Sequence, residues 1–426
     1  MAHHTVKSGY SDLVSRINRF PQGAPPSETL YKILEMLFSQ REAELVALLP
    51  IRPFTVNQAA KAWQQSPDEA QKTLDALADR AILVDIDKRG KTQYVLPPPM
   101  AGFFEFSMMR TRGDLDQATL AELFHQYTHI EEDFIRELLT RGETQFGRTF
   151  VHEPALSEVN ALEVLDYERA SEVIKTAHYR SVGMCYCRHK KEHLDGACDA
   201  PMDICMTFGN TARSLSNHGY SREIDETEAL DLLQLAQEHN LVQFGENARH
   251  GVNFICNCCG CCCEAMTAAR RFAVMNPIHT TNFIPVVDEA ECDGCGKCVN
   301  VCPVEAMSLV SANDPKHPKL KRAKLDESVC LGCGLCVKAC DKDHVHLESR
   351  PQRVITPLNG THRTLMMAIE RGTLQDLIFD NRVLWSHRAL AALLGAILRL
   401  PPLKQAIASR QVKSRYLEHL LNRARA

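Results

Sequence analysis

The chain of 426 residues lacks the features that mark membrane-spanning, exported or nucleotide-binding proteins. No apolar run reaches the roughly 18–20 residues of a membrane-spanning helix. The start, MAHHTVKSGYSDL, has neither the apolar core nor the small-residue cleavage site of a secretory signal. No G-x-G-x-x-G follows an expected strand and no P-loop is present, which argues against a self-sufficient NAD- or flavin-dependent enzyme. The net charge of −4 gives no strong bias toward nucleic acid. These absences favour a cytoplasmic protein without a transmembrane segment.

Cysteine is missing from the first 184 residues and from the last 86, although the chain contains 18. All of them lie between Cys185 and Cys340. A disulfide framework is usually spread over a secreted domain, whereas these spacings are too tight for paired bridges. The distribution therefore predicts metal binding in a reducing compartment.

Eight of the cysteines form two runs with the same spacing of two, two and three intervening residues. The runs are Cys292, Cys295, Cys298 and Cys302, followed by Pro303, and Cys330, Cys333, Cys336 and Cys340, followed by Asp341. This spacing binds 4Fe–4S clusters, because three thiolates on a tight loop hold three irons and the fourth ligand crosses from the other run. One predicted cluster is held by Cys292, Cys295, Cys298 and Cys340, and the other by Cys330, Cys333, Cys336 and Cys302. Zinc or free thiols are the alternatives.

The two runs resemble bacterial two-cluster ferredoxins of the 4Fe–4S type over about 60 residues. The resemblance implies a ferredoxin-like fold and an electron-transfer role. Asp341 departs from the family pattern, which has proline at this place. Proline supplies no ligand, so only the local geometry and the reduction potential are expected to differ.

The N-terminal part is expected to be mainly helical. Residues 28–49 have helical apolar spacing, Thr55 with Gln58 forms a capping box, and Ser66 opens a further helix. Two strands follow, at 82–86 and 92–96. Three helices and a hairpin in this order are typical of a winged-helix domain.

These observations predict a multi-domain α+β protein. The predicted segments are a flexible arm (1–27), a winged-helix-like domain (28–110), a cysteine-rich α+β domain (111–280), a two-cluster ferredoxin domain (281–350) and a basic helical tail (351–426).

Ten further cysteines precede the ferredoxin segment in two groups. The groups are Cys185, Cys187, Cys198 and Cys205, and then Cys256, Cys258, Cys259, Cys261, Cys262 and Cys263. Thiolates so close in sequence repel one another unless a metal neutralises them. We predict a third Fe–S cluster on the first group, with the second group as further candidate ligands. Two further clusters, zinc or a thiol–disulfide pair are the alternatives. If the second segment is extended, its alternate cysteines share a face and adjacent ones do not.

This segment also resembles a family of uncharacterised 4Fe–4S-binding proteins. The matching motifs are CxCR at 185–188, the segment 198–206 and the ICNCC-type segment 255–263. The resemblance implies cluster binding and electron transfer only.

Basic and histidine side chains near the cysteines have functional and structural interpretations. Arg188, with the histidine and two lysines after it, either hydrogen-bonds cluster sulfurs, docks an acidic partner or forms a solvated basic loop. The solvated loop is the preferred interpretation. His193, His218 and His250 are expected to be ordinary polar residues.

Two segments bear on partners. The expected third helix carries two basic and four acidic residues, so residues 28–97 are predicted to bind protein rather than DNA. From residue 381 onward the chain has nine Lys or Arg and one acid, Glu418. Such a tail is able to contact the inner face of a membrane, dock on a partner or pack on the protein itself.

The sequence as a whole predicts an electron-transfer protein with two 4Fe–4S clusters and a further Fe–S centre, working with redox partner proteins as a component of a larger oxidoreductase. A reductase with an open-site upstream cluster and a redox-sensing regulator are the alternatives. An electron carrier is favoured over a stand-alone enzyme, and the reduction potential does not follow from sequence.

Overall fold

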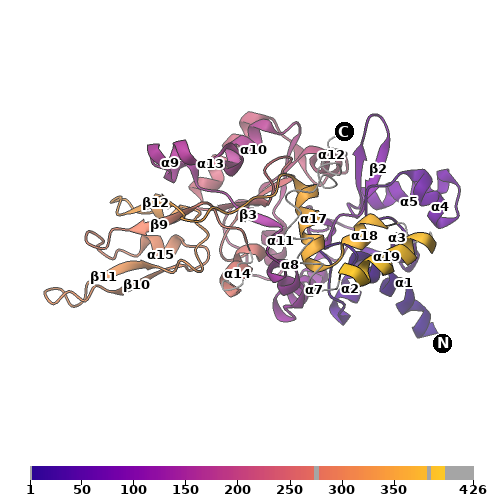
Figure 1. The fold of residues 1–426 in the computed structure, drawn as a ribbon, viewed down its shortest axis with the longest axis horizontal. Helices are drawn as coiled ribbons and strands as arrows, with labels where there is room; N and C mark the ends of the chain where they lie inside the picture. The colour runs from indigo at the N-terminus through magenta and orange to yellow at the C-terminus, as the bar shows by residue number, and fades with distance from the viewer. Residues whose placement is uncertain (1, 273–277, 381–384, 399–426) are drawn as a thin grey trace. The chain divides into compact units, whose positions relative to one another are not determined.

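The computed structural model describes residues 2–272, 278–380 and 385–398 and has mixed α+β architecture (Figure 1). The chain divides into two compact units. The first comprises Met1–Thr144, Asn210–Ser221 and Gly360–Ala426, and the second comprises Gln145–Gly209 and Arg222–Asn359. This division is coarser than the five predicted segments, whose boundaries stay predictions.

The first unit begins with five helices, and the last four of them begin after a Ser or Thr at the N-cap. They are α1 (Ala2–Ile17), α2 (Glu28–Leu37), α3 (Gln40–Ala47), α4 (Val56–Trp63) and α5 (Pro67–Asp79). The Ser66 hydroxyl accepts the Glu69 N–H, which confirms the predicted start of α5. The single helix expected over 28–49 is wrong, because Ser39 forms a second capping box with Glu42 and starts α3 anew.

The flexible arm predicted for residues 1–27 is also corrected, since most of it is helix α1. Leu13, Val14 and Ile17 are buried along one face of α1, at the three- and four-residue spacing of a helical stripe. The Arg16 guanidinium, also buried, donates to the Pro50 carbonyl at 2.5 Å. The segment begins with polar residues and ends in prolines, and for this reason the sequence was interpreted as a flexible arm.

The hairpin follows α5 as expected, with β1 (Val84–Asp87) antiparallel to β2 (Thr92–Val95). The remaining helices of the unit are α6 (Phe104–Phe106), α7 (Gln117–His125), α8 (Asp133–Thr140), α12 (Gly209–Asn217, its first residue assigned to the second unit), α17 (Gly360–Arg371), α18 (Leu374–Ile378) and α19 (Trp385–Leu398). Leu215 of α12 packs with Ala81 and Val84 in a buried cluster. Five helices therefore precede the hairpin where the sequence predicted three, and the winged-helix identity stays a prediction.

The second unit contains an antiparallel six-stranded sheet in the order β3-β7-β8-β5-β4-β6. Its strands are β3 (Gly147–Thr149), β4 (Arg180–Met184), β5 (Asp203–Phe208), β6 (Arg222–Glu223), β7 (Val242–Glu246) and β8 (Phe254–Cys258). Its helices are α9 (Glu158–Glu163), α10 (Ala170–Thr176), α11 (Tyr186–Glu192), α13 (Glu226–Glu238) and α14 (Glu264–Arg271). Val173 and Leu233 of two of these helices join Val182 and Met206 of the sheet in the core.

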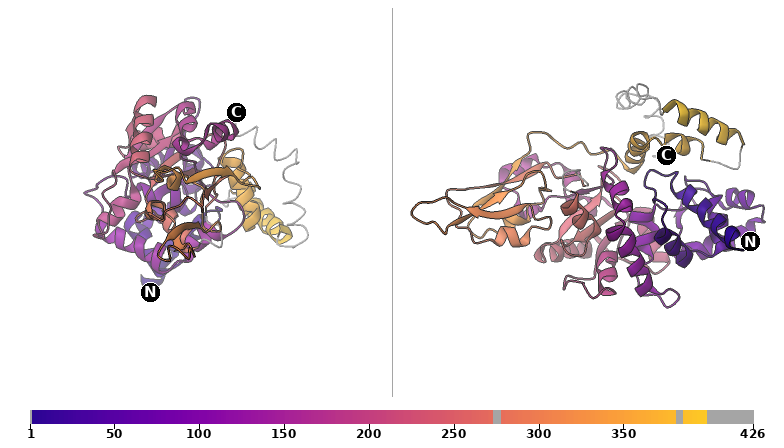
Figure 2. Two further views of the ribbon diagram at one scale, coloured as in Figure 1. Left: turned by 90° about the vertical axis from the view of Figure 1, so that its left-hand side faces the viewer. Right: turned by 90° about the horizontal axis from the view of Figure 1, so that it is seen from below.

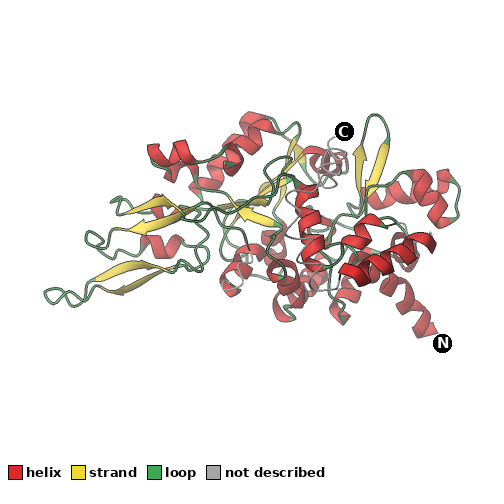
Figure 3. Ribbon diagram, in the orientation of Figure 1, coloured by secondary structure: helices red, strands yellow, loops and turns green. Residues whose placement is uncertain are grey.

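Two small sheets and two short helices complete this unit (Figure 3). Strand β9 (Phe283–Val287) pairs with β12 (Val345–Ser349), and β10 (Met307–Ser311) pairs with β11 (Lys321–Leu325). Each cysteine run leads into a helix, α15 (Lys297–Val301) or α16 (Leu335–Lys338). The loop between β10 and β11 projects away from the other strands of the unit (Figure 2).

The predictions about a transmembrane segment and about the basic tail are compared with the described residues only. Among those residues, no helix combines the length and apolar character that crossing a bilayer requires. Of the basic residues counted from 381 onward, only Arg388 falls within the described part of the chain. The basic tail therefore lies largely outside the described residues.

Candidate metal centres

Each cysteine run folds into a tight loop because two glycines take backbone conformations that favour glycine. Gly294 has φ +70° and Gly332 has φ +68°. A Cβ on Gly294 would lie 2.2 Å from the Lys321 carbonyl oxygen, and one on Gly332 would lie 2.1 Å from that of Phe283. Both loops are therefore pressed against neighbouring strands, which fixes the direction in which their thiols point.

The eight cysteines of the two runs line two cavities, four to each. One cavity is lined by Cys292, Cys295, Cys298 and Cys340, and the other by Cys302, Cys330, Cys333 and Cys336. The fourth cysteine of each run thus lies at the cavity of the other run, which is the arrangement that the sequence predicts. Four soft thiols around one cavity fit the donor set of a 4Fe–4S cluster. The assignment of ligands stays a prediction.

Backbone N–H groups point at several of these sulfurs. Ala306 donates to Cys302 Sγ at 3.2 Å, Ala323 to Cys292 Sγ at 3.4 Å and Gly332 to Cys330 Sγ at 3.3 Å. Such bonds stabilise negative charge on sulfur, as a thiolate ligand requires. Burial acts in the opposite direction and raises the pKa of Cys330 to about 11. A bound metal offsets this penalty, since it takes the place of the proton.

This segment matches one family. Residues 291–344 match the family model of the 4Fe-4S dicluster domain. They form a 4Fe-4S dicluster domain, and the match implies two 4Fe–4S clusters. It covers a small part of the chain, and no curated protein matches the chain.

The two cavities of the dicluster domain differ in exposure. Cys295 is exposed at the first cavity, and two ion pairs lie at its rim, Lys297 with Asp341 and Lys342 with Asp293. Asp341, which replaces the proline of the ferredoxin pattern, therefore forms an ion pair with Lys297 at the rim of the same cavity. At the second cavity Cys330 and Cys336 are buried, and the Cys333 carbonyl accepts the His152 N–H at 2.8 Å. The first cavity faces solvent, whereas the second lies against the rest of its unit.

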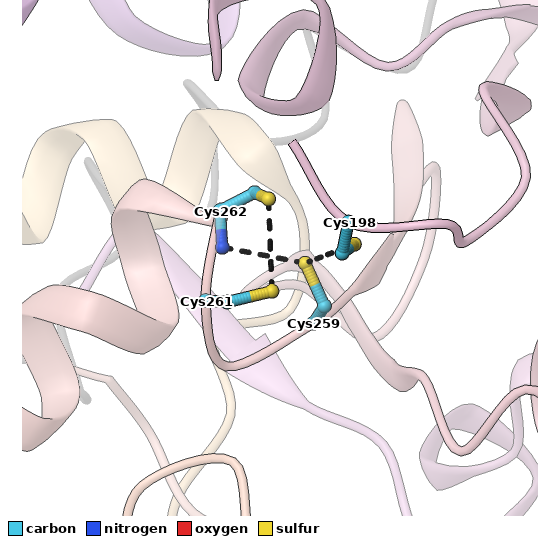
Figure 4. A group of neighbouring side chains, drawn as sticks. All are labelled: Cys198, Cys259, Cys261 and Cys262. Carbon is cyan, nitrogen blue, oxygen red and sulfur yellow. Dashed lines mark hydrogen bonds between the residues drawn. The ribbon is translucent and has the colours of Figure 1, made fainter. Parts of the chain in front are cut away.

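Four of the ten upstream cysteines form a compact group, which we call the four-thiol group. Its members are Cys198, Cys259, Cys261 and Cys262, and their sulfurs all lie within 4.8 Å of one another (Figure 4). The Cys198–Cys259 and Cys261–Cys262 sulfur distances are 3.7 and 3.6 Å. The Cys262 N–H donates to Cys259 Sγ at 3.4 Å because the chain turns directly after β8. This group is able to bind a metal.

The other six upstream cysteines form a second group, which we call the six-thiol group. Its members are Cys185, Cys187, Cys205, Cys256, Cys258 and Cys263. The fold brings their side chains together, so that the pKa of Cys205 is raised beside Cys185 and Cys256, and the pKa of Cys187 is raised beside Cys185 and Cys263. The Cys258 and Cys263 sulfurs lie 3.1 Å apart, too far for a disulfide bond of about 2.05 Å.

The structure therefore groups the upstream cysteines differently from the sequence prediction. Cys185, Cys187 and Cys205 stay together, but Cys198 lies with the three cysteines of the turn after β8. Cys256 and Cys258 share one group, as alternate residues of a strand should. Adjacent Cys261 and Cys262 also share a group, because that part of the segment is a turn and not extended. The identity of the ligands stays a prediction.

The basic residues after Cys187 are buried, which corrects their interpretation as a solvated loop. Arg188 is 1% exposed and donates to the Pro201 carbonyl at 3.1 Å and the Asn257 carbonyl at 2.8 Å. Burial lowers its pKa, but the thiols of Cys185 and Cys205 more than offset this, so the net pKa is raised and the guanidinium stays charged.

Lys190 is also buried and forms an ion pair with Glu264 at the start of α14. A charge that is removed from water is strongly stabilised only when it is paired, so this pair fixes α11 against α14 beside Cys263. Composition alone could not reveal it, since charged residues are usually exposed. His218 lies elsewhere, in the first unit, where its ring hydrogen-bonds Asp79 and Asp85.

The turn of the four-thiol group packs against the dicluster domain. A Cβ on Gly260 would lie 2.6 Å from the Pro303 carbonyl oxygen and 2.9 Å from the Pro303 Cα. Pro303 follows Cys302, whose side chain lines the second cavity. The turn that carries the four-thiol group therefore contacts the backbone directly after Cys302, a cysteine that lines the second cavity.

Proposed function

We propose that this protein transfers electrons through two 4Fe–4S clusters and works as a component of a larger oxidoreductase system. The observation that carries the proposal is the division of the eight run cysteines between two cavities, with the fourth cysteine of each run crossing over. A redox partner would exchange electrons at the first cavity, where Cys295 is exposed. The rim there carries paired charges of both signs, which favours a weak, salt-sensitive docking contact.

We further propose that the four-thiol group holds a third, iron-containing centre on this path. The contact of Gly260 with Pro303 supports this, because it leaves no intervening side chain between the turn and the segment that follows Cys302. The sulfur spacing supports a single tetrahedral ion. Metal–sulfur bonds of about 2.3 Å place tetrahedral ligand sulfurs roughly 3.8 Å apart, close to the observed 3.6 and 3.7 Å.

Metal and sulfide analysis of the full chain, purified without air, tests both parts. About eight iron and eight sulfide per chain belong to the dicluster domain. A ninth iron without extra sulfide supports a single-iron centre, and about twelve of each supports a third cubane. Zinc in place of the extra iron would refute the redox role of the four-thiol group while leaving the dicluster carrier intact. A protein without sulfide would refute the carrier itself.

We propose that residues 28–97 form a winged-helix-like domain that binds a protein partner and not DNA. Helix α5 exposes Asp75 and Asp79, and Arg80 at its end is occupied by an ion pair with Glu42. Only Lys72 remains as an exposed cation on this helix. A DNA mobility shift at low salt, lost as salt rises, would contradict this assignment.

A further inference from the structure

The six-thiol group lies outside the path described above and has no role in it. Its cysteines come from five places in the chain, after β4, at the start of α11, on β5, on β8 and before α14. Strands β8, β5 and β4 are neighbours in the sheet, with Met206 opposite Ile255 and Gly183 opposite Cys205. The fold thus gathers thiols that are up to 78 residues apart, from Cys185 to Cys263, into one place where three of them are buried and three are half-buried.

We propose that the six-thiol group is a metal centre separate from the four-thiol group, and that it binds an iron–sulfur cluster. The proposal goes beyond the electron path, which uses the dicluster domain and the four-thiol group. It commits the ten upstream cysteines to two centres and not to one.

The first argument is the chemistry of the donor set. A single buried cysteine behaves as a small apolar residue, and a thiol is only a weak hydrogen-bond donor and acceptor. Six thiols gathered in one place therefore stabilise the fold little through hydrogen bonds. They are, however, the ligands that soft metals prefer, with no carboxylate among them. The 3.1 Å between Cys258 and Cys263 also places two sulfurs close enough to share one metal.

The second argument is the buried charge of Arg188. Its guanidinium donates to carbonyl oxygens, and the side chains that most favour its charged form are Cys185, Cys205 and Cys259. An uncompensated buried charge is costly, and thiolates that ligate a cluster supply the negative charge that compensates it.

Arg188 also shows why the two groups are distinct centres. Thiols of both groups favour its charged form, Cys185 and Cys205 of the six-thiol group and Cys259 and Cys198 of the four-thiol group. A cation between two clusters of thiolates reduces their mutual repulsion. One centre made of all ten thiols would have to enclose this side chain, which is instead held by the Pro201 and Asn257 carbonyls.

Additivity of metal loss tests the proposal. In the full chain, purified without air, Cys185→Ser, Cys187→Ser and Cys205→Ser are combined to leave three thiols in the six-thiol group. A second variant combines Cys259→Ser and Cys261→Ser, and a third carries all five changes. Iron, zinc and sulfide are measured per chain, with the dicluster iron of about eight as the internal reference.

Two separate centres predict that each variant loses a different metal complement and that the combined variant loses the sum. Equal losses that do not add would show one shared centre and overturn the proposal. No loss in the first variant would show that the six-thiol group holds no metal, while the retained dicluster iron would leave the electron-carrier proposal standing.

A measurement on the unaltered chain covers the case in which a variant fails to fold. Thiols are alkylated in the native protein with and without a chelator, and labelling is mapped by peptide. Labelling of Cys185 and Cys187 that rises severalfold with the chelator supports a metal at this group. Labelling that does not change with the chelator, while Cys259 responds, would overturn it.

Discussion

The contact between Gly260 and Pro303 gives the sharpest prediction, because one methyl group suffices to disturb it. In Gly260→Ala the new Cβ would lie 2.6, 2.9 and 3.1 Å from the carbonyl oxygen, Cα and carbonyl carbon of Pro303. All three are backbone atoms, so no side chain can rotate out of the way. Gly260 is not in the left-handed backbone region, and the effect is therefore steric and not conformational.

The magnitude follows from overpacking, which costs about 1–3 kcal/mol when a methyl group meets a well-packed backbone. In a unit of this size each kcal/mol lowers the apparent Tm by roughly 2–4 °C. The displaced Pro303 also moves Cys302 at the second cavity. We expect Gly260→Ala to lower the apparent Tm of the cluster-loaded protein by several degrees. We also expect it to alter the electron paramagnetic resonance signal of one reduced cluster and not of the other.

The matched control is Gly196→Ala, in the same unit. Its Cβ would meet the Leu194 carbonyl oxygen at 3.7 Å and the Lys191 Cδ at 3.9 Å, which are ordinary contacts. This variant should keep both the Tm and the cluster signals. If Gly260→Ala has the same Tm and the same two signals as the control, the turn does not pack on Pro303 and the proposed link between the centres is wrong.

Three further predictions follow from single side chains. Cys302→Ser should remove about four iron atoms and the signal of the buried cluster, and Cys340→Ser should remove those of the exposed cluster; the opposite pairing, read by iron content and spectroscopy, would exclude crossed ligation. Lys190→Met should lower the unfolding free energy by about 3–5 kcal/mol, because it removes the cation of a buried ion pair, whereas Lys175→Met removes an exposed pair and should leave that free energy nearly unchanged in the same denaturant titration. The hydrogen bond to Asp85 raises the pKa of His218, so the stability it contributes is complete below about pH 6.5 and is lost as pH rises through the raised pKa. A Tm profile of His218→Gln between about pH 6 and pH 8 should therefore be flatter than that of the unaltered chain, and an identical slope would contradict this reasoning.

The dicluster domain was predictable from sequence because its cluster ligands are cysteines separated by only two or three residues. Each run holds three ligands within seven residues, and the crossing of the fourth follows from the same local pattern. The grouping of the upstream cysteines was not predictable in this way. Cys198 joins Cys259 only because β5 pairs with β8 and the chain turns after Cys258, and no local spacing encodes that pairing.

Burial of charge was the second feature that sequence reasoning missed. A run of Arg, His and two Lys is ordinarily solvated, and the expectation of a basic loop followed from that tendency. The structure buries Arg188 among thiols and Lys190 against Glu264, so each has a specific partner. Asn257, whose carbonyl accepts from Arg188, and Glu264 are distant in sequence, which is why composition gave no sign of them. Helix α1 was missed for a different reason, since its apolar stripe is short and follows a polar start.

The surroundings of the two dicluster cavities act on reduction in opposite directions. Reduction adds negative charge to a cluster, which water stabilises at the exposed first cavity and burial disfavours at the second. The second cavity compensates with N–H bonds to Cys302 and Cys330, and with Arg350, which donates to the Cys330 carbonyl at 2.9 Å. Exposure alone therefore does not order the two potentials. The first cavity also has such a bond, from Ala323 to Cys292 Sγ, so it is the additional donor and Arg350 at the second cavity that offset its burial and make an electron there, next to the Pro303 segment that the four-thiol turn contacts, more stable than exposure alone would predict.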